Sequence, residues 1–97
     1  MTIEKTVNGT EATLKIEGWM DTQSAPMLEQ ALKELEAEVK HLVLDLSGLE
    51  YISSAGIRQI VAAHKLLNGE LTLRNVNIEV QDVLTMTGIA KKLHIVS

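Results

Sequence analysis

In the stretch 45-DLSGLEYISSAGIRQI-60, an apolar strand pattern gives way to a helix pattern within a few residues. The strand pattern begins just before it, in an apolar run of Leu42, Val43, Leu44 and Leu46. Such a run is typical of a strand covered on both faces. Residues 54–68 follow with helical spacing, and "ELTLRNV" (70–76) is a second strand candidate. The order predicts a crossover that joins two parallel strands through a helix.

The segments on either side complete an alternating pattern of strands and helices. Asn8-Gly9 is a turn signal between two alternating segments, which predicts an amphipathic hairpin in the first twenty residues. Residues 24–40 have apolar residues three and four apart and predict a helix, with Ser24 or Thr22 as its cap. A short helix is expected from Asn77 to Thr87, ended by Gly88 and followed by the apolar stretch "LHIV".

Composition limits the classes of protein that fit. The 97 residues favour one domain, 1–97, and the absence of cysteine excludes disulfides, thiolate catalysis and Cys-bound zinc. The net charge is −4, with one Trp, one Tyr and no Phe, so no basic patch with stacking aromatics is available for nucleic acid. No apolar stretch approaches the roughly 20 residues of a membrane span. We therefore expect a cytoplasmic protein without membrane insertion.

The helix predicted over residues 54–68 has unusually few polar positions. One apolar stripe is expected to face the sheet, formed by Ile57, Ile60, Val61, His64 and Leu67. The remaining surface is also thinly polar, because it includes Ala62, Ala63 and Leu66. A helix that is apolar nearly all round is either deeply buried or reserves one face for a partner, and the pattern leaves both possibilities open.

Catalysis by Ser54 is not supported by the sequence. A serine nucleophile needs a neighbouring base, yet His64 lies ten residues further along the same helix, ~15 Å away along its axis. His41 and His94 belong to other segments, and the three histidines lack metal-ligand spacing. "SSAG" is not the G-x-S-x-G elbow of hydrolases, and no phosphate-binding glycine loop is present. We expect no enzyme activity, metal or cofactor.

Ser54 then has two possible roles at the start of the helix. Its hydroxyl could cap the helix by accepting a hydrogen bond from a free backbone N–H. Alternatively, it could be exposed and receive a phosphate, which the N–H groups and the helix dipole would stabilise. The local pattern does not choose between them.

In combination, these motifs resemble the STAS domain family, and in particular the bacterial anti-sigma factor antagonists. The similar segments are Asp45-Leu46-Ser47-Gly48-Leu49, Tyr51-Ile52, Ser53-Ser54-Ala55-Gly56, "GWMDTQSAPML" (18–28) and "VLTMTGI" (83–89). Ser54 matches the serine that is phosphorylated in the family, whereas Ser53 stands where an acidic residue is usual. The resemblance spans essentially the whole chain in order.

The resemblance implies an α/β domain with a mixed sheet of four or five strands and helices packed on one face. It also implies a phosphorylation-switched binding module: unphosphorylated at Ser54, the domain would bind an anti-sigma factor serine kinase and free a sigma factor. Phosphorylation would release the kinase, and a phosphatase would reset the domain. The expected contact surface combines the start of the helix with its outward face, namely Asp21, Ser53, Ser54, Gly56, Arg58, Ala62 and Lys65.

The same family implies one alternative function. The chain could instead be a non-phosphorylated STAS subunit of a bacterial lipid-transport ATPase, in which the same helix serves only as a structural clamp.

Overall fold

The computed structural model describes residues 1–96, and the last residue of the predicted domain, 97, lies outside the described part. The order of elements matches the predicted alternation. Along the chain these are β1 (Thr2–Asn8), β2 (Glu11–Met20), α1 (Ala25–Lys33), β3 (His41–Ile52), α2 (Ser54–Leu66), β4 (Leu71–Arg74), α3 (Ile78–Met86), a 3-10 helix η1 (Ile89–Lys92) and β5 (His94–Val96).

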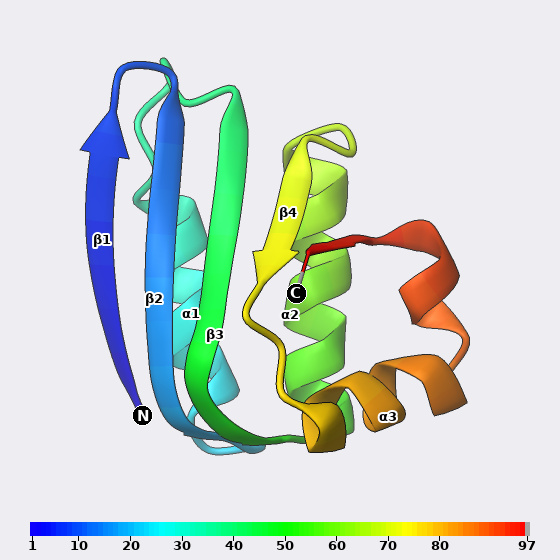
Figure 1. Ribbon diagram of the computed structural model, residues 1–97. Helices are drawn as coiled ribbons and strands as arrows, with labels where there is room; N and C mark the ends of the chain where they lie inside the picture. The colour runs from blue at the N-terminus through cyan, green and yellow to red at the C-terminus, as the bar shows by residue number, and fades with distance from the viewer. Residues whose placement is uncertain (97) are drawn as a thin grey trace.

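One mixed sheet carries all the strands, in the order β1-β2-β3-β4-β5 (Figure 1). The hairpin strands β1 and β2 are antiparallel, and every other neighbouring pair is parallel. Helix α1 connects β2 to β3, and α2 connects β3 to β4, so the predicted strand–helix–strand crossover is confirmed. The C-terminal ends of β2 and β3 therefore lie at the same end of the sheet, and α2 begins there.

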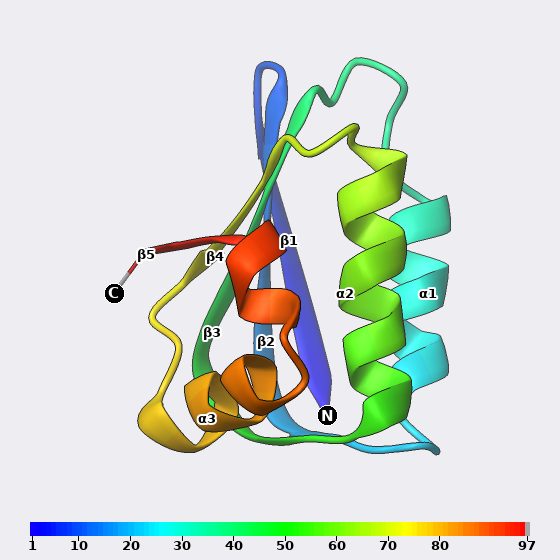
Figure 2. The ribbon, with the colours of Figure 1, turned by 90° about the vertical axis from the view of Figure 1, so that its right-hand side faces the viewer.

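Helices α1 and α2 lie side by side on one face of the sheet, as Figure 2 shows. The prediction of a sheet with helices on one face is confirmed, but the expectation that the central strand is covered on both faces is wrong. On the open face, Val43 stands in register between Thr13 and Thr72. Val43 is buried there because neighbouring strands flank it, and not because a second layer covers it.

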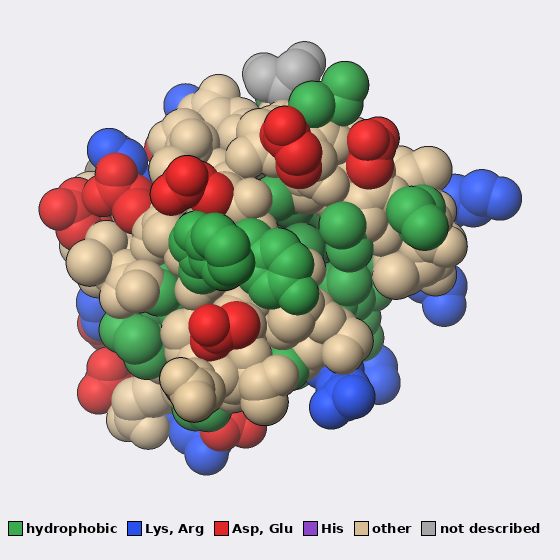
Figure 3. Space-filling view, turned by 90° about the horizontal axis from the view of Figure 1, so that it is seen from below, with side chains coloured by type: hydrophobic (Ala, Val, Ile, Leu, Met, Phe, Trp, Pro, Cys, Tyr) green, Lys and Arg blue, Asp and Glu red, His purple; other side chains and the backbone are tan. Residues whose placement is uncertain are grey.

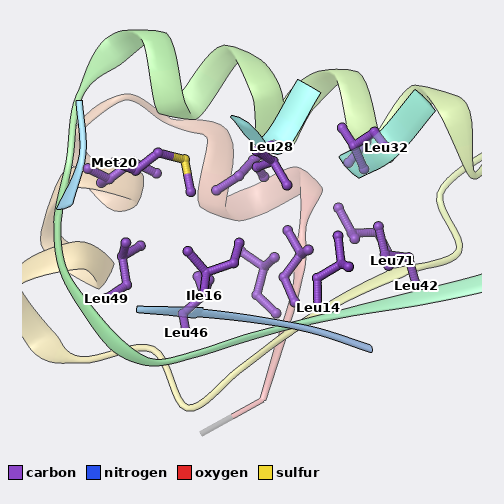
Figure 4. Close-up of a cluster of buried hydrophobic side chains, with 14 of the residues drawn as sticks. Leu14, Ile16, Met20, Leu28, Leu32, Leu42, Leu46, Leu49 and Leu71 are labelled. Atoms are coloured by element: carbon purple, nitrogen blue, oxygen red, sulfur yellow. The ribbon is translucent and has the colours of Figure 1, made fainter. Parts of the chain in front are cut away.

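Side chains from one face of the sheet and from the helices make a single core (Figure 4). In β2, every second residue from Ala12 to Ile16 points inward, as the alternation predicted. Met20 lies at one end of the cluster, and Leu42 and Leu71 lie at the other. No helix within residues 1–96 is long and apolar enough to cross a membrane.

The first helix is shorter than the predicted 24–40, because it ends at Lys33. The following residues must bring the chain back from the helix end to the start of β3. Lys40 N–H and His41 N–H both donate to the Thr10 carbonyl, at 2.6 and 3.2 Å, which anchors this return beside the hairpin turn. Val39 is buried along that path. The apolar spacing that predicted a helix up to residue 40 therefore includes a residue of a loop.

Helix α2 matches its predicted range to within two residues, but its buried face is rotated from the expected one. Ile60 and Leu67 are buried as predicted, whereas Ile57, Val61 and His64 are only half-buried. Gly56 and Ala63 take their places against the core. The last predicted helix is confirmed as α3, with Asn77 capping Val80 N–H at 2.8 Å and Gly88 following in the left-handed conformation at φ 78°.

We predict that Leu44→Asp abolishes cooperative unfolding. Leu44 is fully buried in the central strand, so the substitution buries an unpaired carboxylate and costs several kcal/mol. Urea denaturation followed by circular dichroism measures the loss. Thr6→Asp is the control, because Thr6 is exposed on the edge strand β1, and the stability of this variant should stay within about 0.5 kcal/mol of the parent. A Leu44→Asp variant that unfolds like the parent would contradict the central position of β3.

Candidate functional site

The cap of helix α2 is Ser53, not Ser54. Ser53 has an extended backbone (φ −96°, ψ 173°), and its Oγ accepts a hydrogen bond from Gly56 N–H at 3.3 Å. Its carbonyl accepts from Ile57 N–H at 3.0 Å. Ser54 therefore does not have the capping role that the sequence allowed, because it is the first residue inside the helix.

Ser54 is exposed on the first turn of α2. Of the first four helical N–H groups, those of Gly56 and Ile57 bond to Ser53. Among the hydrogen bonds of residues 1–96, none uses the N–H of Ser54 or Ala55 as donor. The Ser54 hydroxyl thus stands in the positive field of a helix N-terminus, next to two N–H groups without a protein acceptor.

Asp21 organises the turn between β2 and α1. Its Oδ1 accepts hydrogen bonds from Gln23 N–H at 3.0 Å and from Ser24 N–H at 2.9 Å. The Ser24 N–H, followed by the Ser24 hydroxyl, lowers the pKa of the Asp21 carboxyl below its usual value. Ser24 occupies the predicted cap position, but its hydroxyl donates to the Trp19 carbonyl at 2.7 Å and does not accept from the helix. Asp21 is therefore a half-buried, negatively charged residue with a structural role in this turn.

The turn at Asp21 and the start of α2 are held side by side. Ser53 N–H donates to the Met20 carbonyl at 2.8 Å, which ties the end of β3 to the end of β2. Gly56 packs below this bond: a Cβ added there would lie 2.8 Å from Ile52 Cγ1 and 2.8 Å from Met20 Sδ. Because Gly56 is buried, its predicted place on the contact surface is wrong, and its role is to let the helix approach the strands.

The other predicted contact residues on α2 share one outward face. Arg58, Ala62 and Lys65 are exposed and follow one another at spacings of four and three residues, so they form a stripe that begins at Ser54. Ala62 also borders an open groove of about 620 Å³ between α1 and α2. The half-exposed Leu66 lines the same groove. The face therefore combines the small Ala62 with two positive charges, Arg58 and Lys65.

The sequence interpretation missed an aromatic pair at this end of the sheet. The rings of Trp19 and Tyr51 lie with centroids 5.2 Å apart, and the residues are paired in register across β2 and β3. Alternation with the buried Met20 could have placed Trp19 on the outer face. Tyr51 gave no such signal, because the pairing of β2 and β3 shifts register twice between Lys15 and Trp19.

Within residues 1–96, the histidines lie apart from Ser54. His64 is half-buried ten residues after Ser54 on the same helix, and His41 contacts Glu70 and Thr72 at the start of β3. Within residues 1–96 no three His, Asp or Glu side chains are grouped to hold a metal ion. What the site offers is an exposed hydroxyl, two N–H donors and an exposed helix face with Ala62 between Arg58 and Lys65, which suit binding and modification.

Residues 2–97 match the sequence profile of the STAS domain. Because the match covers almost the whole chain, the protein belongs to the STAS domain family. This confirms the resemblance seen in the motifs around Ser54.

Within the family, the chain is similar to anti-sigma factor antagonists. It is 29% identical over 83 residues to the anti-sigma F factor antagonist of Paenibacillus polymyxa, which covers 80% of this chain and 71% of that protein. The crystal structure of an anti-sigma factor antagonist from Mycobacterium paratuberculosis superposes with a TM-score of 0.86 at 25% identity, covering 97% of this chain and 83% of that one.

The fold alone reaches beyond that group. The crystal structure of a sulfate transporter family protein from Wolinella succinogenes superposes with a TM-score of 0.79 at 20% identity, covering 94% of this chain and 80% of that one. Shared architecture therefore does not separate a regulatory domain from a transporter domain, and the functional argument has to come from the site.

We predict that Ser53→Ala and Ser54→Ala have different effects on stability. Ser53→Ala removes the cap of α2 and should lower the free energy of unfolding by about 1 kcal/mol. Ser54→Ala, at an exposed first-turn position, should change it by less than about 0.5 kcal/mol. Chemical denaturation measures both. The opposite order of effects would return the capping role to Ser54.

Proposed function

We propose that this STAS domain is an anti-sigma factor antagonist controlled by phosphorylation of Ser54. When Ser54 is unphosphorylated, the domain binds an anti-sigma factor that is also a serine kinase, and a sigma factor is freed. The observation that carries this proposal is the exposed Ser54 hydroxyl at the start of α2, on a helix whose cap is supplied by another residue. Similarity to named anti-sigma factor antagonists supports it.

The kinase docks over the N-terminus of α2 and along its outward face. Small side chains such as Ala62 allow close approach, and Arg58 and Lys65 give the surface its charge pattern. Asp21 and Ser53 lie at the junction beside Ser54, where they fix the shape of the contact surface from within. The contact surface is therefore held by backbone hydrogen bonds before the partner arrives.

Phosphorylation changes the contact without unfolding the domain. The Ser54 hydroxyl attacks the γ-phosphorus of ATP held by the kinase, ADP leaves, and the hydroxyl proton is released. The added charge of about −1.5 to −2 lies beside the free N–H groups of α2 and in its positive field, which stabilise it in the free domain. A docked partner that supplies no Lys or Arg at Ser54 itself must strip water from that phosphate without compensation, and this desolvation weakens the complex.

A phosphatase that hydrolyses the phosphoserine resets the domain. In this cycle the domain is substrate and ligand, and the kinase and phosphatase supply the catalysis. Because a freed sigma factor acts in the cytoplasm, the proposed cycle implies that the domain is cytoplasmic. The alternative, a non-phosphorylated subunit of a lipid-transport ATPase, uses the same helix face but gives the Ser54 hydroxyl no role.

Substitutions at Ser54 test the switch. We predict that Ser54→Ala binds the anti-sigma factor kinase of the source organism and is not released by ATP. Ser54→Asp should bind more weakly by a few kcal/mol while melting like the parent, because the carboxylate is stabilised in the free domain and desolvated in the complex. Calorimetric titration with and without ATP measures these effects. Ser53→Ala is the control and should remain releasable. Release of Ser54→Ala by ATP would contradict phosphorylation at Ser54.

A second substitution tests the helix face. Ala62 is exposed, so Ala62→Glu should keep the stability within about 0.5 kcal/mol of the parent. It should nonetheless abolish kinase binding, because a large charged side chain would stand where the small Ala62 lets the partner approach closely. Thr6→Glu adds the same charge on the exposed edge strand β1 and should bind normally. Normal binding by Ala62→Glu would remove this face from the contact surface.

A further inference from the structure

The end of the sheet next to Ser54 carries an exposed aromatic pair. Trp19 is 58% exposed and Tyr51 is 43% exposed, although their rings contact each other. Figure 3, which views this end of the molecule from below, shows hydrophobic side chains gathered near its centre. Large aromatic side chains left in water at one place mark a candidate interaction surface.

The backbone holds this pair in place. β2 shifts register against β3 between Gly18 and Trp19, and Gly18 has a φ of +103° that a residue with a side chain rarely adopts. After the shift Trp19 pairs with Tyr51 on the outer face, while Met20 and Ile52 pair in the core. The Trp19 carbonyl is also fixed by the Ser24 hydroxyl at 2.7 Å. The backbone that carries the pair is therefore fixed before any partner binds.

This aromatic pair is continuous with the site at Ser54. Tyr51 is three residues before Ser54, and the intervening Ser53 is bonded to Met20, the residue that follows Trp19. Helix α3 begins at the same end, because Asn77 Nδ2 donates to the Leu49 carbonyl at 2.6 Å. Its first residue, Ile78, is also exposed. A partner that covers the start of α2 thus meets apolar side chains on the adjacent strand ends.

Carboxylates accompany the aromatic pair. Glu17 precedes Trp19 by two residues, Glu50 directly precedes Tyr51, and Asp21 follows Met20. None of these three forms a salt bridge within the described part of the chain. In Figure 3 acidic side chains lie on several sides of the central hydrophobic group, and Lys and Arg side chains lie towards the edges of the view. The surface is apolar at its centre and negative around it.

We propose that Trp19 and Tyr51 are a second part of the docking surface for the kinase that binds at Ser54. The kinase segment that covers them carries an apolar side chain flanked by Lys or Arg, which pair with Glu17 and Glu50 at the strand ends and not with Ser54. This inference rests on the proposed function and adds the chemistry of the partner. A second copy of the chain fits less well, because pairing this end with itself would bring Glu17, Asp21 and Glu50 against carboxylates of the same sign.

The single tryptophan gives a direct test. The chain is labelled with 5-fluorotryptophan, which yields one ¹⁹F resonance because Trp19 is the only Trp. Unlabelled kinase is then added. We expect the resonance to shift and to lose its sensitivity to D₂O as the ring leaves water. A resonance unchanged at saturating kinase overturns the inference, and this measurement needs no variant.

Binding affinities of variants complete the test. Trp19→Ala should weaken kinase binding at least tenfold, and Trp19→Phe should recover part of that loss. Glu50→Lys should weaken binding several-fold at low salt, with a smaller effect at high salt. Val7→Ala is the control: Val7 is 44% exposed near the hairpin turn, at the opposite end of β1 and β2, and its loss should not change affinity. Melting temperatures identify any variant that fails to fold.

The outcomes separate the two proposals. If Ser54→Asp weakens binding while the ¹⁹F resonance and the Trp19→Phe and Glu50→Lys affinities stay as in the parent, the inference is wrong and the proposed function stands. If the parent chain does not bind the kinase, both are wrong. Concentration-dependent dimerisation that Trp19→Ala removes would assign this surface to a second copy and would also overturn the inference.

Discussion

The site depends on how helix α2 is fastened to the ends of two parallel strands. The hydrogen bond from Ser53 N–H to the Met20 carbonyl joins β2 to the end of β3, and Gly56 lets the first turn of α2 pack against Met20 and Ile52. A side chain at position 56 would need space already filled by those two residues. Since the Ser53 hydroxyl caps the helix, the next residue is left at the surface with its hydroxyl free.

In this arrangement, the residues that hold the site in shape are different from the residues that are exposed to modification or to a partner. Asp21, Ser53 and Gly56 are committed to hydrogen bonds or packing, whereas Ser54 and Ala62 are exposed and take little part in stability. A charge added to Ser54 therefore acts on a partner more than on the fold. Such a division suits a domain that must remain folded in both states of a cycle.

The open face and end of the sheet leave room for contacts beyond the helix. Helices cover one face only, so the outer face of β2 and β3 reaches the surface up to the point where α2 begins. At that point the strands carry Trp19 and Tyr51 within an acidic setting. In the proposed complex, a basic, partly apolar segment of the partner covers the strand ends beside α2, and its positive charges face Glu17 and Glu50, away from Ser54.

The sequence by itself determined the order of strands and helices, the parallel crossover and the family, and it led to the proposal for Ser54. These follow from local periodicity and from motifs contiguous in the chain. It gave the wrong end for α1, because Val39 is buried by a returning loop whose apolar spacing imitates a helix. Only the tertiary structure decided which serine caps α2, that Gly56 is buried, and that Trp19 meets Tyr51 on the outer face. Those facts depend on where β2 ends relative to β3, and the register shifts that fix this arise from pairing between segments about thirty residues apart, which no local pattern encodes.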